Sequence, residues 1–431
     1  MRVYVYKDLV GLARVEIVNT DCVPVSFCLS HFMLSSFAAR PFNTRYTYAK
    51  VMLFIFRYFK LNGISLTKRA QEGQFLTTEE YKAFKRHAGY RVSEDKGTLK
   101  GSVAQLRCVQ RQVSEKKLDD MIHATHTSSA QVAANTRKLR LRLLHDYLNY
   151  LFTTFHATAA PTAQVSITLG QLCKAIRLDI KSIRKDNCDV RDPYAQAIPD
   201  STFFKLLDIT RVHSAQNPWK GARLRNQLIV ALLSETGVRR GALAKIKISN
   251  FKRRGDQHYL LVTRTPGDPT DSRKLPASQK TRAHTAPISN SLMKLIRHYI
   301  NTERSQSQAS LQHDFLLVSQ KGKTAGMPIA LSTINGLFNT LSQRLELRIH
   351  PHLLRHKWNE IFSMKAKAQG YSMEQIEDLR KYAMGWSINS SMGSLYNEFH
   401  NAISVLQIAQ ARQKAFLTDG ECENVNKAHS K

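Results

Sequence analysis

The chain has 431 residues, 42% of them hydrophobic, and its 64 Lys and Arg against 33 Asp and Glu give a formal net charge of +31. A chain of this length is longer than a single hydrophobic core usually supports, which predicts two or three domains. So large a positive excess repels itself unless a polyanion neutralises it, which favours nucleic acid as the partner over a membrane surface or an acidic protein.

Cysteine spacing and hydropathy narrow the class of protein further. The six cysteines form no CxxC pair and no metal-finger spacing, so we expect buried thiols in a reducing compartment. No apolar run approaches the roughly 18 residues of a membrane span. Charges interrupt the first residues too often for a signal peptide. These features predict an intracellular, cytoplasmic protein.

The N-terminal third predicts a strand-containing arm, residues 1–40, followed by helices. The alternating stretches ARVEIVN and VPVSFCL are typical of short strands. TRYTYAKVMLFIFRYFKLNG predicts a helix, with polar residues ahead of it and Gly63 behind. A second helix is expected in TTEEYKAFKRHAG, because Thr77 and Glu80 have the spacing of a capping box.

Residues 89–134 are polar and weakly periodic, which indicates a loop or an insertion. The next stretch, NTRKLRLRLLHDYLNYLF, predicts a strong helix with one apolar face. Its other faces carry basic residues, which are Arg137, Lys138, Arg140 and Arg142. A solvated face is the ordinary explanation, but in so basic a chain we favour a DNA-facing surface. Residues 41–158 thus predict an all-helical, DNA-binding domain.

A domain boundary is expected in the linker region 159–195, where a short helical pattern, ITLGQLCKAIRL, meets the polar run DIKSIRKDNCDVRDP. Residues 196–417 predict an α+β domain, mainly helical with a small antiparallel sheet. Helices are expected in PDSTFFKLLDIT and in RNQLIVALLSETG, which ends at Gly237. Strands are expected at 258–264 and 284–289, and residues 418–431 read as a disordered tail.

The stretch HPHLLRH concentrates ionisable side chains at the start of a predicted helix. Pro351 suits the first helical turn. His352 and Arg355 then share a face while Leu353 and Leu354 can point to the core. Imidazole and guanidinium on one face suit an oxyanion, because Arg binds phosphate bidentately. The alternative is a surface Arg beside a hydrogen-bonded His.

A pair of adjacent arginines lies in ETGVRRGALAKIKISNF, where Arg239 and Arg240 follow the end of the apolar helix. Adjacent helical residues point about 100° apart, so only one of the two can face a given site. For either, an ordinary surface charge is the alternative.

In their order and spacing these motifs resemble the tyrosine site-specific recombinases of the phage-integrase type. That family carries an Arg in a TGLRxxEL-like turn, a hairpin Lys, an HxLRH segment, a His or Trp in an LGH-like turn, and a final Tyr. The resemblance covers about residues 195–410 and, less specifically, the helical domain before it. The matching residues are Arg239 in TGVRRGAL, Lys280 in SQKTRAHTAPI, His352, Arg355 and His356 in HLLRH, and Trp386 and Tyr396 in MGWSINSSMGSLYNEFH.

Three positions depart from the family pattern. Ala242 stands where a Glu usually follows the first Arg, Trp386 stands where many members have His, and the interval from Trp386 to Tyr396 is one residue longer than usual. Of these departures, Ala242 is the one that could weaken activity.

The resemblance implies that Tyr396 attacks a DNA phosphodiester and forms a 3′-phosphotyrosine with a free 5′-hydroxyl. Arg239 and Arg355 would stabilise the transition-state charge, His352 would act as base, and Lys280 would protonate the leaving oxygen. Trp386 would bind a phosphate oxygen or pack, and His356 would support its neighbours. Neither a metal nor another cofactor is required.

The resemblance also implies the partners. These are double-stranded DNA, a homotetramer on paired sites, and an accessory factor for DNA bending or directionality, with no membrane and with a location at the nucleoid. The segment NAISVLQIAQARQKAF would serve assembly through Leu406, Ala409, Gln410 and Phe416, although packing within one chain remains equally open.

Two other functions compete with a recombinase for a mobile element. A type IB topoisomerase shares the chemistry but relaxes supercoils as a monomer. A catalytically silent DNA-binding regulator is the second alternative, and Ala242 is the feature that supports it.

Overall fold

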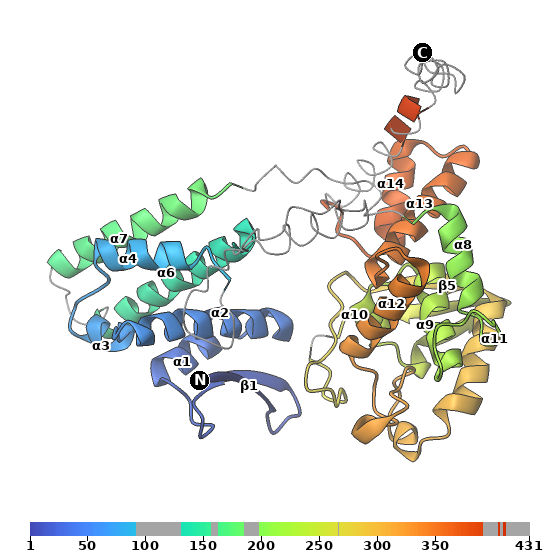
Figure 1. The fold of residues 1–431 in the computed structure, drawn as a ribbon, viewed down its shortest axis with the longest axis horizontal. Coiled ribbons are helices and arrows are strands. Elements are labelled where there is room, and N and C mark those ends of the chain that lie inside the picture. Colours follow the sequence, from blue (N-terminus) through green and yellow to red (C-terminus); the bar gives the residue numbers. More distant parts are fainter. Residues whose placement is uncertain are drawn as a thin grey trace, which may run out of the picture. The chain divides into compact units, whose positions relative to one another are not determined.

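The computed structural model describes residues 1–91, 131–156, 163–184, 198–265, 267–390, 404–405 and 408–410. The chain divides into two compact units, one of Met1–Tyr6 with Arg14–Val190 and one of Lys7–Ala13 with Arg191–Lys431. Helices dominate both units, and the strands form small sheets (Figure 1). The predicted fold class, mainly helical with a small antiparallel sheet, is confirmed.

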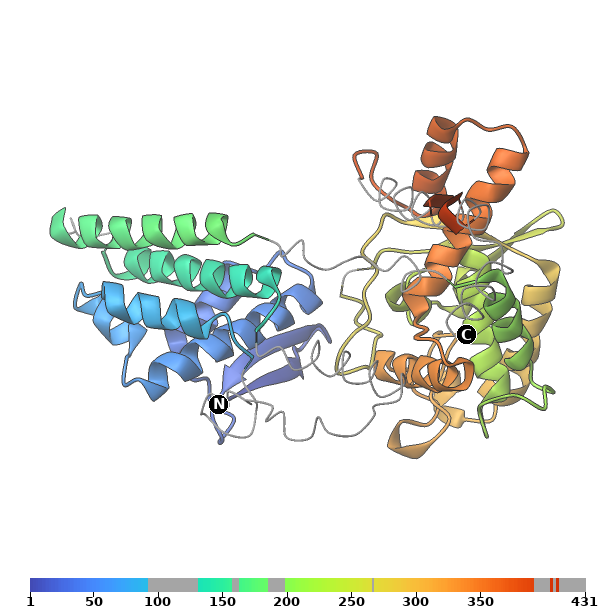
Figure 2. The same cartoon turned by 45° about the horizontal axis from the view of Figure 1, so that its top comes forward.

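The first unit packs its helices around one aromatic-rich core. Phe32, Phe59, Phe84 and Tyr147 are almost fully buried there. Helices α4, α6 and α7 run beside one another in both views (Figures 1 and 2). The elements of this unit are β1 (Arg2–Lys7), β2 (Ala13–Val18), α1 (Phe27–Ser35), α2 (Phe42–Leu61), α3 (Leu66–Gln71), α4 (Thr78–His87), α6 (Ala134–His156) and α7 (Ala163–Ser182).

Local sequence signals explain several of these elements. The capping box of α4 is present, because Thr77 accepts a hydrogen bond from the Glu80 backbone N–H and Glu80 accepts one from the Thr77 backbone. Leu143, Tyr147 and Leu151 of α6 are each at most 1% exposed, as their helical spacing predicted. The strand predicted in ARVEIVN is β2.

Two expectations about the first unit need correction. VPVSFCL does not form a strand, since α1 begins at Phe27 and buries Leu29 in the core. Most of the region expected to be a linker is helix α7, whose Asp179 accepts a hydrogen bond from Tyr81 (2.7 Å) and pairs with Lys85 (2.5 Å). The apolar face of α7 therefore belongs to the first unit's core. Most of the predicted insertion 89–134 lies outside the described residues.

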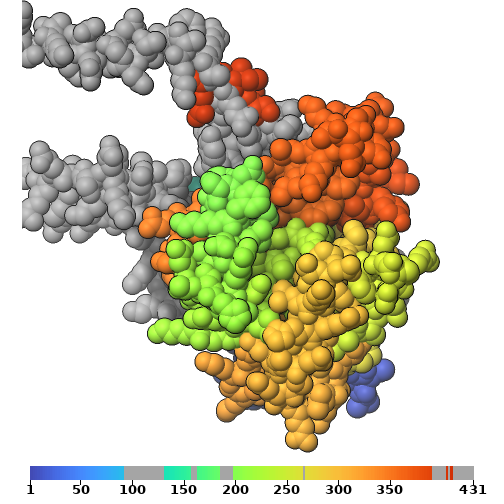
Figure 3. Space-filling view, turned by 90° about the vertical axis from the view of Figure 1, so that its right-hand side faces the viewer, coloured from blue at the N-terminus to red at the C-terminus, as the bar shows by residue number. Residues whose placement is uncertain are grey.

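The second unit surrounds helix α9, which packs against α11, α13 and strand β5. Figure 3 shows α8 and α9 (green) beside α13 and α14 (orange-red) on one face. The elements of this unit are α8 (Asp200–Ile209), α9 (Arg223–Thr236), α10 (Arg240–Leu243), β3 (Phe251–Arg254), β4 (Gln257–Val262), β5 (His284–Ile288), α11 (Asn290–Tyr299), α12 (Leu331–Leu345), α13 (Pro351–Ala368) and α14 (Met373–Ala383), with short turns η2 (Ile248–Asn250), η3 (Ile300–Arg304), η4 (Gln308–Gln312) and η5 (Gly322–Thr324).

The sheet of the second unit has the order β3-β4-β5, and both pairings are antiparallel. Leu260 lies opposite Ala286, and Val262 lies opposite His284. Leu260 and Ala286 are buried, which places these positions on the inner face of the sheet. The predicted strands β4 and β5 are confirmed, and β3 adds a third.

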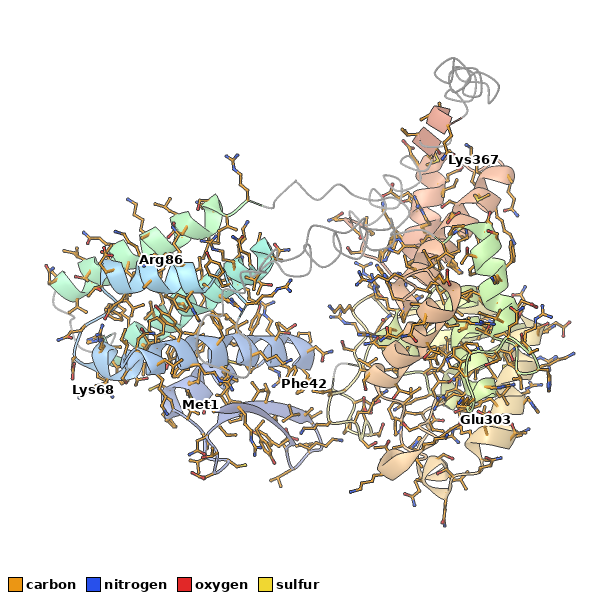
Figure 4. The ribbon with its side chains drawn as sticks, viewed as in Figure 1. Met1, Phe42, Lys68, Arg86, Glu303 and Lys367 are labelled. Carbon is orange, nitrogen blue, oxygen red and sulfur yellow. The ribbon has the colours of Figure 1, made fainter. Side chains whose placement is uncertain are left out.

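Polar contacts fix α9 at its N-terminal end. The Glu303 carboxylate (labelled in Figure 4) accepts hydrogen bonds from the backbone N–H groups of Leu224 (3.3 Å) and Arg225 (3.1 Å). These are donors that a helix leaves unpaired in its first turn.

Within the described part of the chain, no helix has the length and apolarity needed to cross a membrane.

Candidate active site

The turn after α9 presents Arg239. The helix ends at Gly237, Arg239 is the extended residue that precedes α10, and α10 begins at Arg240. The two neighbouring arginines separate here, because Arg240 donates a hydrogen bond to the Asn335 side chain of α12. Arg239 instead lies close enough to His352 for its charge to lower the pKa of that imidazole. Arg239 is therefore the member of the pair that faces the histidines.

Arg355 is one of the most deeply buried side chains, at 1% exposure, and not a surface charge. Helix α13 begins at Pro351 as predicted, and Leu353 and Leu354 beside Arg355 pack into the core. The Arg355 guanidinium donates to the Gly237 carbonyl oxygen (2.7 Å) and to that of Met384 (3.5 Å). The turn that carries Arg239 thus also holds Arg355.

Histidines line the same end of α13. The His352 and His356 rings lie 4.5 Å apart edge to face, and His350 stacks with His352 at 6.4 Å. Desolvation by the protein, followed by the charges of Arg355, His350 and Arg239, lowers the pKa of His352 to about 4. The His352 residue itself remains exposed at the surface of the second unit. His352 is neutral at pH 7 and can accept a proton.

His356 is buried, unlike His352, at 7% exposure. Burial first, and then the neighbouring histidines and Arg355, lower its pKa to about 4. Its ring supports His352 from the next helical turn.

The turn after α14 closes the site with Trp386. This indole is 5% exposed and packs with Met384 and Trp358. The Arg355 guanidinium carbon lies 5.7 Å from its ring centroid. Trp386 therefore has the surroundings of a packing residue beside Arg355, and its contact with a phosphate oxygen stays a prediction.

A long loop between β4 and β5 carries Lys280, which is exposed. Two other lysines near this loop are engaged in internal contacts, because Lys245 donates to Thr265 (2.6 Å to the hydroxyl) and Lys247 pairs with Asp268 (2.8 Å). The exposed Lys280 ammonium can thus move toward a bound ligand, and its role stays a prediction.

A buried ion pair anchors that loop. Arg273 and Asp271 are 8% and 2% exposed and pair at 2.8 Å. Arg273 also donates to the backbone oxygens of Ala244 (2.7 Å) and Ile329 (3.0 Å). These contacts fix the loop to the segment after α10, near Arg239.

His284 is a site residue that the sequence analysis missed. It opens β5, and the charges of Arg355 and Arg239 both act on its imidazole. Its place two residues before Ala286, on the buried side of a predicted strand, was the signal that could have found it.

The four basic residues of α6 do not share one environment. Arg142 is exposed and Lys138 is half-buried. Arg140 points inward, where it donates to the backbone oxygens of Ala88 (3.0 Å) and Tyr90 (2.8 Å) and lies 3.7 Å from the Phe54 ring centroid. Burial lowers the pKa of Arg140 to about 10. Arg140 thus stabilises the first unit, and the Arg137 Nε is buried as well.

The nucleophile predicted from the sequence, Tyr396, lies outside the described residues, as do Leu406 and Phe416 of the predicted assembly segment and the tail 418–431. Within the described part, Ala242 is 4% exposed and packs in the core of the second unit. A methyl group therefore occupies the position where the family pattern has a carboxylate.

Comparison with known proteins finds a family match within the second unit. Residues 205–398 match the phage integrase family, and this span contains Arg239, His352, Arg355 and position 396. Over this span the chain is similar to the phage integrase family, which includes the tyrosine site-specific recombinases.

Curated relatives and solved structures give more distant matches. The chain is 27% identical over 132 residues to transposase A from transposon Tn554 of Staphylococcus aureus, a match that covers 31% of this chain and about a third (34%) of that protein. A complex of the XerH site-specific recombinase with its difH substrate matches at 16% identity, 70% and 75% coverage of the two chains and a TM-score of 0.40. The Tn1549 transposon integrase in complex with circular intermediate DNA matches at 13% identity. That match covers 67% of this chain and 82% of that chain, with a TM-score of 0.39.

Proposed function

We propose that the chain is a site-specific DNA recombinase, an integrase of a mobile genetic element, that cleaves and rejoins duplex DNA through a 3′-phosphotyrosine at Tyr396. One observation carries this proposal. The residues from Gly237 to Arg239 present one arginine and hold a second, Arg355, beside a neutral His352. Two guanidinium groups next to a proton acceptor suit the charge and the proton transfer of phosphodiester exchange.

The proposed cleavage step assigns each change to a residue. The Tyr396 oxygen forms a bond to phosphorus while the bond from phosphorus to the 5′-oxygen breaks. His352 takes the phenol proton, and Lys280 supplies a proton to the departing 5′-oxygen. Arg239 and Arg355 stabilise the negative charge on the non-bridging oxygens. The phosphotyrosyl bond keeps the energy of the broken one, so rejoining needs no nucleotide cofactor.

Double-stranded DNA is the proposed substrate, because a polyanion neutralises the net charge of +31. In the first unit, Arg142 and Lys138 on α6 are the proposed phosphate contacts, since Arg140 is engaged inside the unit. The proposal includes tetramer assembly on two paired sites, an accessory DNA-bending or directionality factor, and action at the nucleoid.

A plasmid assay separates this function from the two competing ones. The substrate is a supercoiled plasmid with two directly repeated copies of the element's junction sequence, incubated with the native chain or with Tyr396→Phe. A recombinase yields two smaller circles with the native chain and none with the variant. Relaxed plasmid of unchanged length would indicate a topoisomerase, and retarded but uncut plasmid would indicate a silent DNA-binding protein.

A further inference from the structure

His284 occupies a strand position that directs its side chain into the second unit. It opens β5, and Ala286 and Ile288 follow at alternating positions with 3% and 6% exposure. Side chains two apart on a strand share a face, so the imidazole lies on the inner face of the sheet. Across the strand pair its neighbour is Val262.

The hydrogen bonding of His284 determines which nitrogen holds its proton. Nδ1 lies 3.1 Å from the backbone oxygen of Arg282. A carbonyl oxygen can only accept, so Nδ1 carries the hydrogen and Nε2 keeps a lone pair. Nε2 is buried and has no hydrogen-bond partner within the described residues. A buried polar atom without a partner is costly, which makes Nε2 a candidate for a ligand contact.

The turn after α14 brings His284 close to Arg355. Gly385 has φ of +62°, and a Cβ there would lie 2.5 Å from His284 Nδ1, so the backbone passes directly against the imidazole. The Gly385 carbonyl accepts a hydrogen bond from the Arg282 N–H (2.9 Å). The residues on either side, Met384 and Trp386, contact Arg355. The imidazole and the buried guanidinium thus share one short turn.

Burial and the neighbouring cations both favour the neutral form of His284 in the free protein. Burial lowers its pKa, the Arg282 carbonyl acts in the opposite direction, and the charges of Arg355 and Arg239 lower it further. The neighbouring elements contribute Val262 from β4, Gly385 after α14, Arg355 from α13 and Arg239 before α10. The charged groups among these are both permanent cations.

We propose that His284 is a further phosphate-binding residue of this site, and that its Nε2 takes up one proton from solvent when a DNA phosphodiester enters. The inference rests on the proposed function, since it requires a DNA backbone between the two arginines. A phosphodiester anion offsets the cations that keep the imidazole neutral. The protonated Nε2 then donates a hydrogen bond to a non-bridging oxygen, while Nδ1 keeps its bond to Arg282.

Histidine-selective NMR on the full chain tests this proton uptake. The protein is Tyr396→Phe with ¹³C-labelled histidine, alone or with a duplex that carries the element's junction sequence. The His284 signal is assigned by its loss in His284→Asn. We expect the titration midpoint of His284 to rise by about one pH unit or more on DNA binding.

Binding measurements with the same duplex provide the second readout. His284→Asn keeps a side-chain amide that can donate to the Arg282 carbonyl but cannot be protonated. If His284 takes up one proton, its contribution to affinity falls by up to about tenfold per pH unit as the pH rises, and the variant loses that part of the slope. His298→Asn should retain the native slope.

The outcomes distinguish a failure of the His284 proposal from a failure of the proposed recombinase function. DNA that binds and is cleaved by the native chain while His284 stays neutral overturns the inference and leaves the proposed function intact. An unchanged pH slope in a folded His284→Asn variant overturns the inference as well. Failure of the native chain to bind any duplex overturns both.

Discussion

Arg239 and Arg240 are neighbours in the chain, but their side chains have different surroundings. Arg239 precedes α10 in an extended conformation and acts on His352 and His284, whereas Arg240 bonds to Asn335 of α12. Because the backbone conformation changes between them, the Arg239 side chain lies at the candidate site and the Arg240 side chain contacts α12. The sequence could narrow the choice to this pair but could not resolve it, because the selection depends on where α12 lies.

A pair of lysine substitutions tests this assignment. Lysine keeps the positive charge but loses the planar fork that holds two oxygens at once. We expect Arg239→Lys to slow DNA cleavage by roughly 10²–10³-fold, the usual loss for one oxyanion donor. Arg240→Lys should leave the cleavage rate within a few-fold of the native rate. Single-turnover cleavage of a nicked duplex measures both, and equal losses in the two variants would contradict the assignment.

Protonation of His356 links the site to the stability of the second unit. Its folded pKa, about 4, lies below the unfolded value of about 6.5. The unfolded chain therefore binds more protons, and the stabilisation present at neutral pH is lost as the pH falls from about 6.5 towards 4.

We expect His356→Gln to lose less stability on acidification than the native chain. The difference should be on the order of 2 kcal/mol between pH 7 and pH 5, because one pKa unit corresponds to about 1.4 kcal/mol. Urea unfolding at the two pH values measures it, with His298→Gln as the exposed control. If the native chain and His356→Gln lose equal stability, the assignment of His356 as a buried, neutral residue is wrong.

At the scale of elements, the approach of the β4–β5 loop to α10 positions Lys280. Gly241 makes that approach possible, since a Cβ there would lie 2.3 Å from the Ser278 carbonyl oxygen. The buried Asp271–Arg273 pair holds the same loop from its other end. Loop and helix meet through backbone, so no side chain can yield to an added methyl group.

Gly241→Ala should therefore displace the segment that carries Lys280. We expect slower DNA cleavage with little change in DNA affinity, because proton transfer to the leaving oxygen depends on the position of Lys280. Gly336→Ala on the exposed face of α12 is the matched control. It has nothing within 4 Å and should stabilise the protein by up to about 1 kcal/mol. Native cleavage rates in Gly241→Ala would contradict this role of the loop.

Elements with strong local signals were predictable from the sequence. The Thr77–Glu80 capping box, the Pro351 start of α13 and the end of α9 at Gly237 all lie where predicted. The strand prediction for VPVSFCL was wrong. Its alternating pattern suits a strand, but the apolar face of α1 is buried by packing against the rest of the first unit. The strand position of His284 could be predicted, but its approach to Arg355 could not. That approach depends on the turn after α14, where Gly385 lies against the imidazole.

The whole molecule carries a net charge of +31, which makes binding to a polyanion strongly dependent on salt. Exposed and internal cations contribute differently to such binding. On α6, Arg142 is exposed, whereas Arg140 is held by two backbone carbonyls. Counting basic residues in the sequence cannot make this distinction.

Two glutamine substitutions on α6 should therefore act on different properties. Arg142→Gln should reduce the slope of log affinity against log salt by about 0.9, the value for one lost phosphate contact. Arg140→Gln should leave that slope unchanged and lower the melting temperature, because the Ala88 and Tyr90 carbonyls lose a charged donor. Salt titrations by fluorescence anisotropy, together with thermal melts, measure both effects. The reverse pattern would contradict the placement of these two side chains.

The most direct test of the account is covalent capture of DNA at Tyr396. A suicide duplex, nicked next to the cleavage site and carrying the element's junction sequence, traps the adduct because the cut fragment diffuses away. We expect a protein–DNA adduct on a denaturing gel with the native chain and with Tyr382→Phe, which alters an exposed tyrosine of α14, and none with Tyr396→Phe. Peptide mapping should place the nucleotide on Tyr396. DNA binding without any adduct, or an adduct that survives in Tyr396→Phe, would contradict the account.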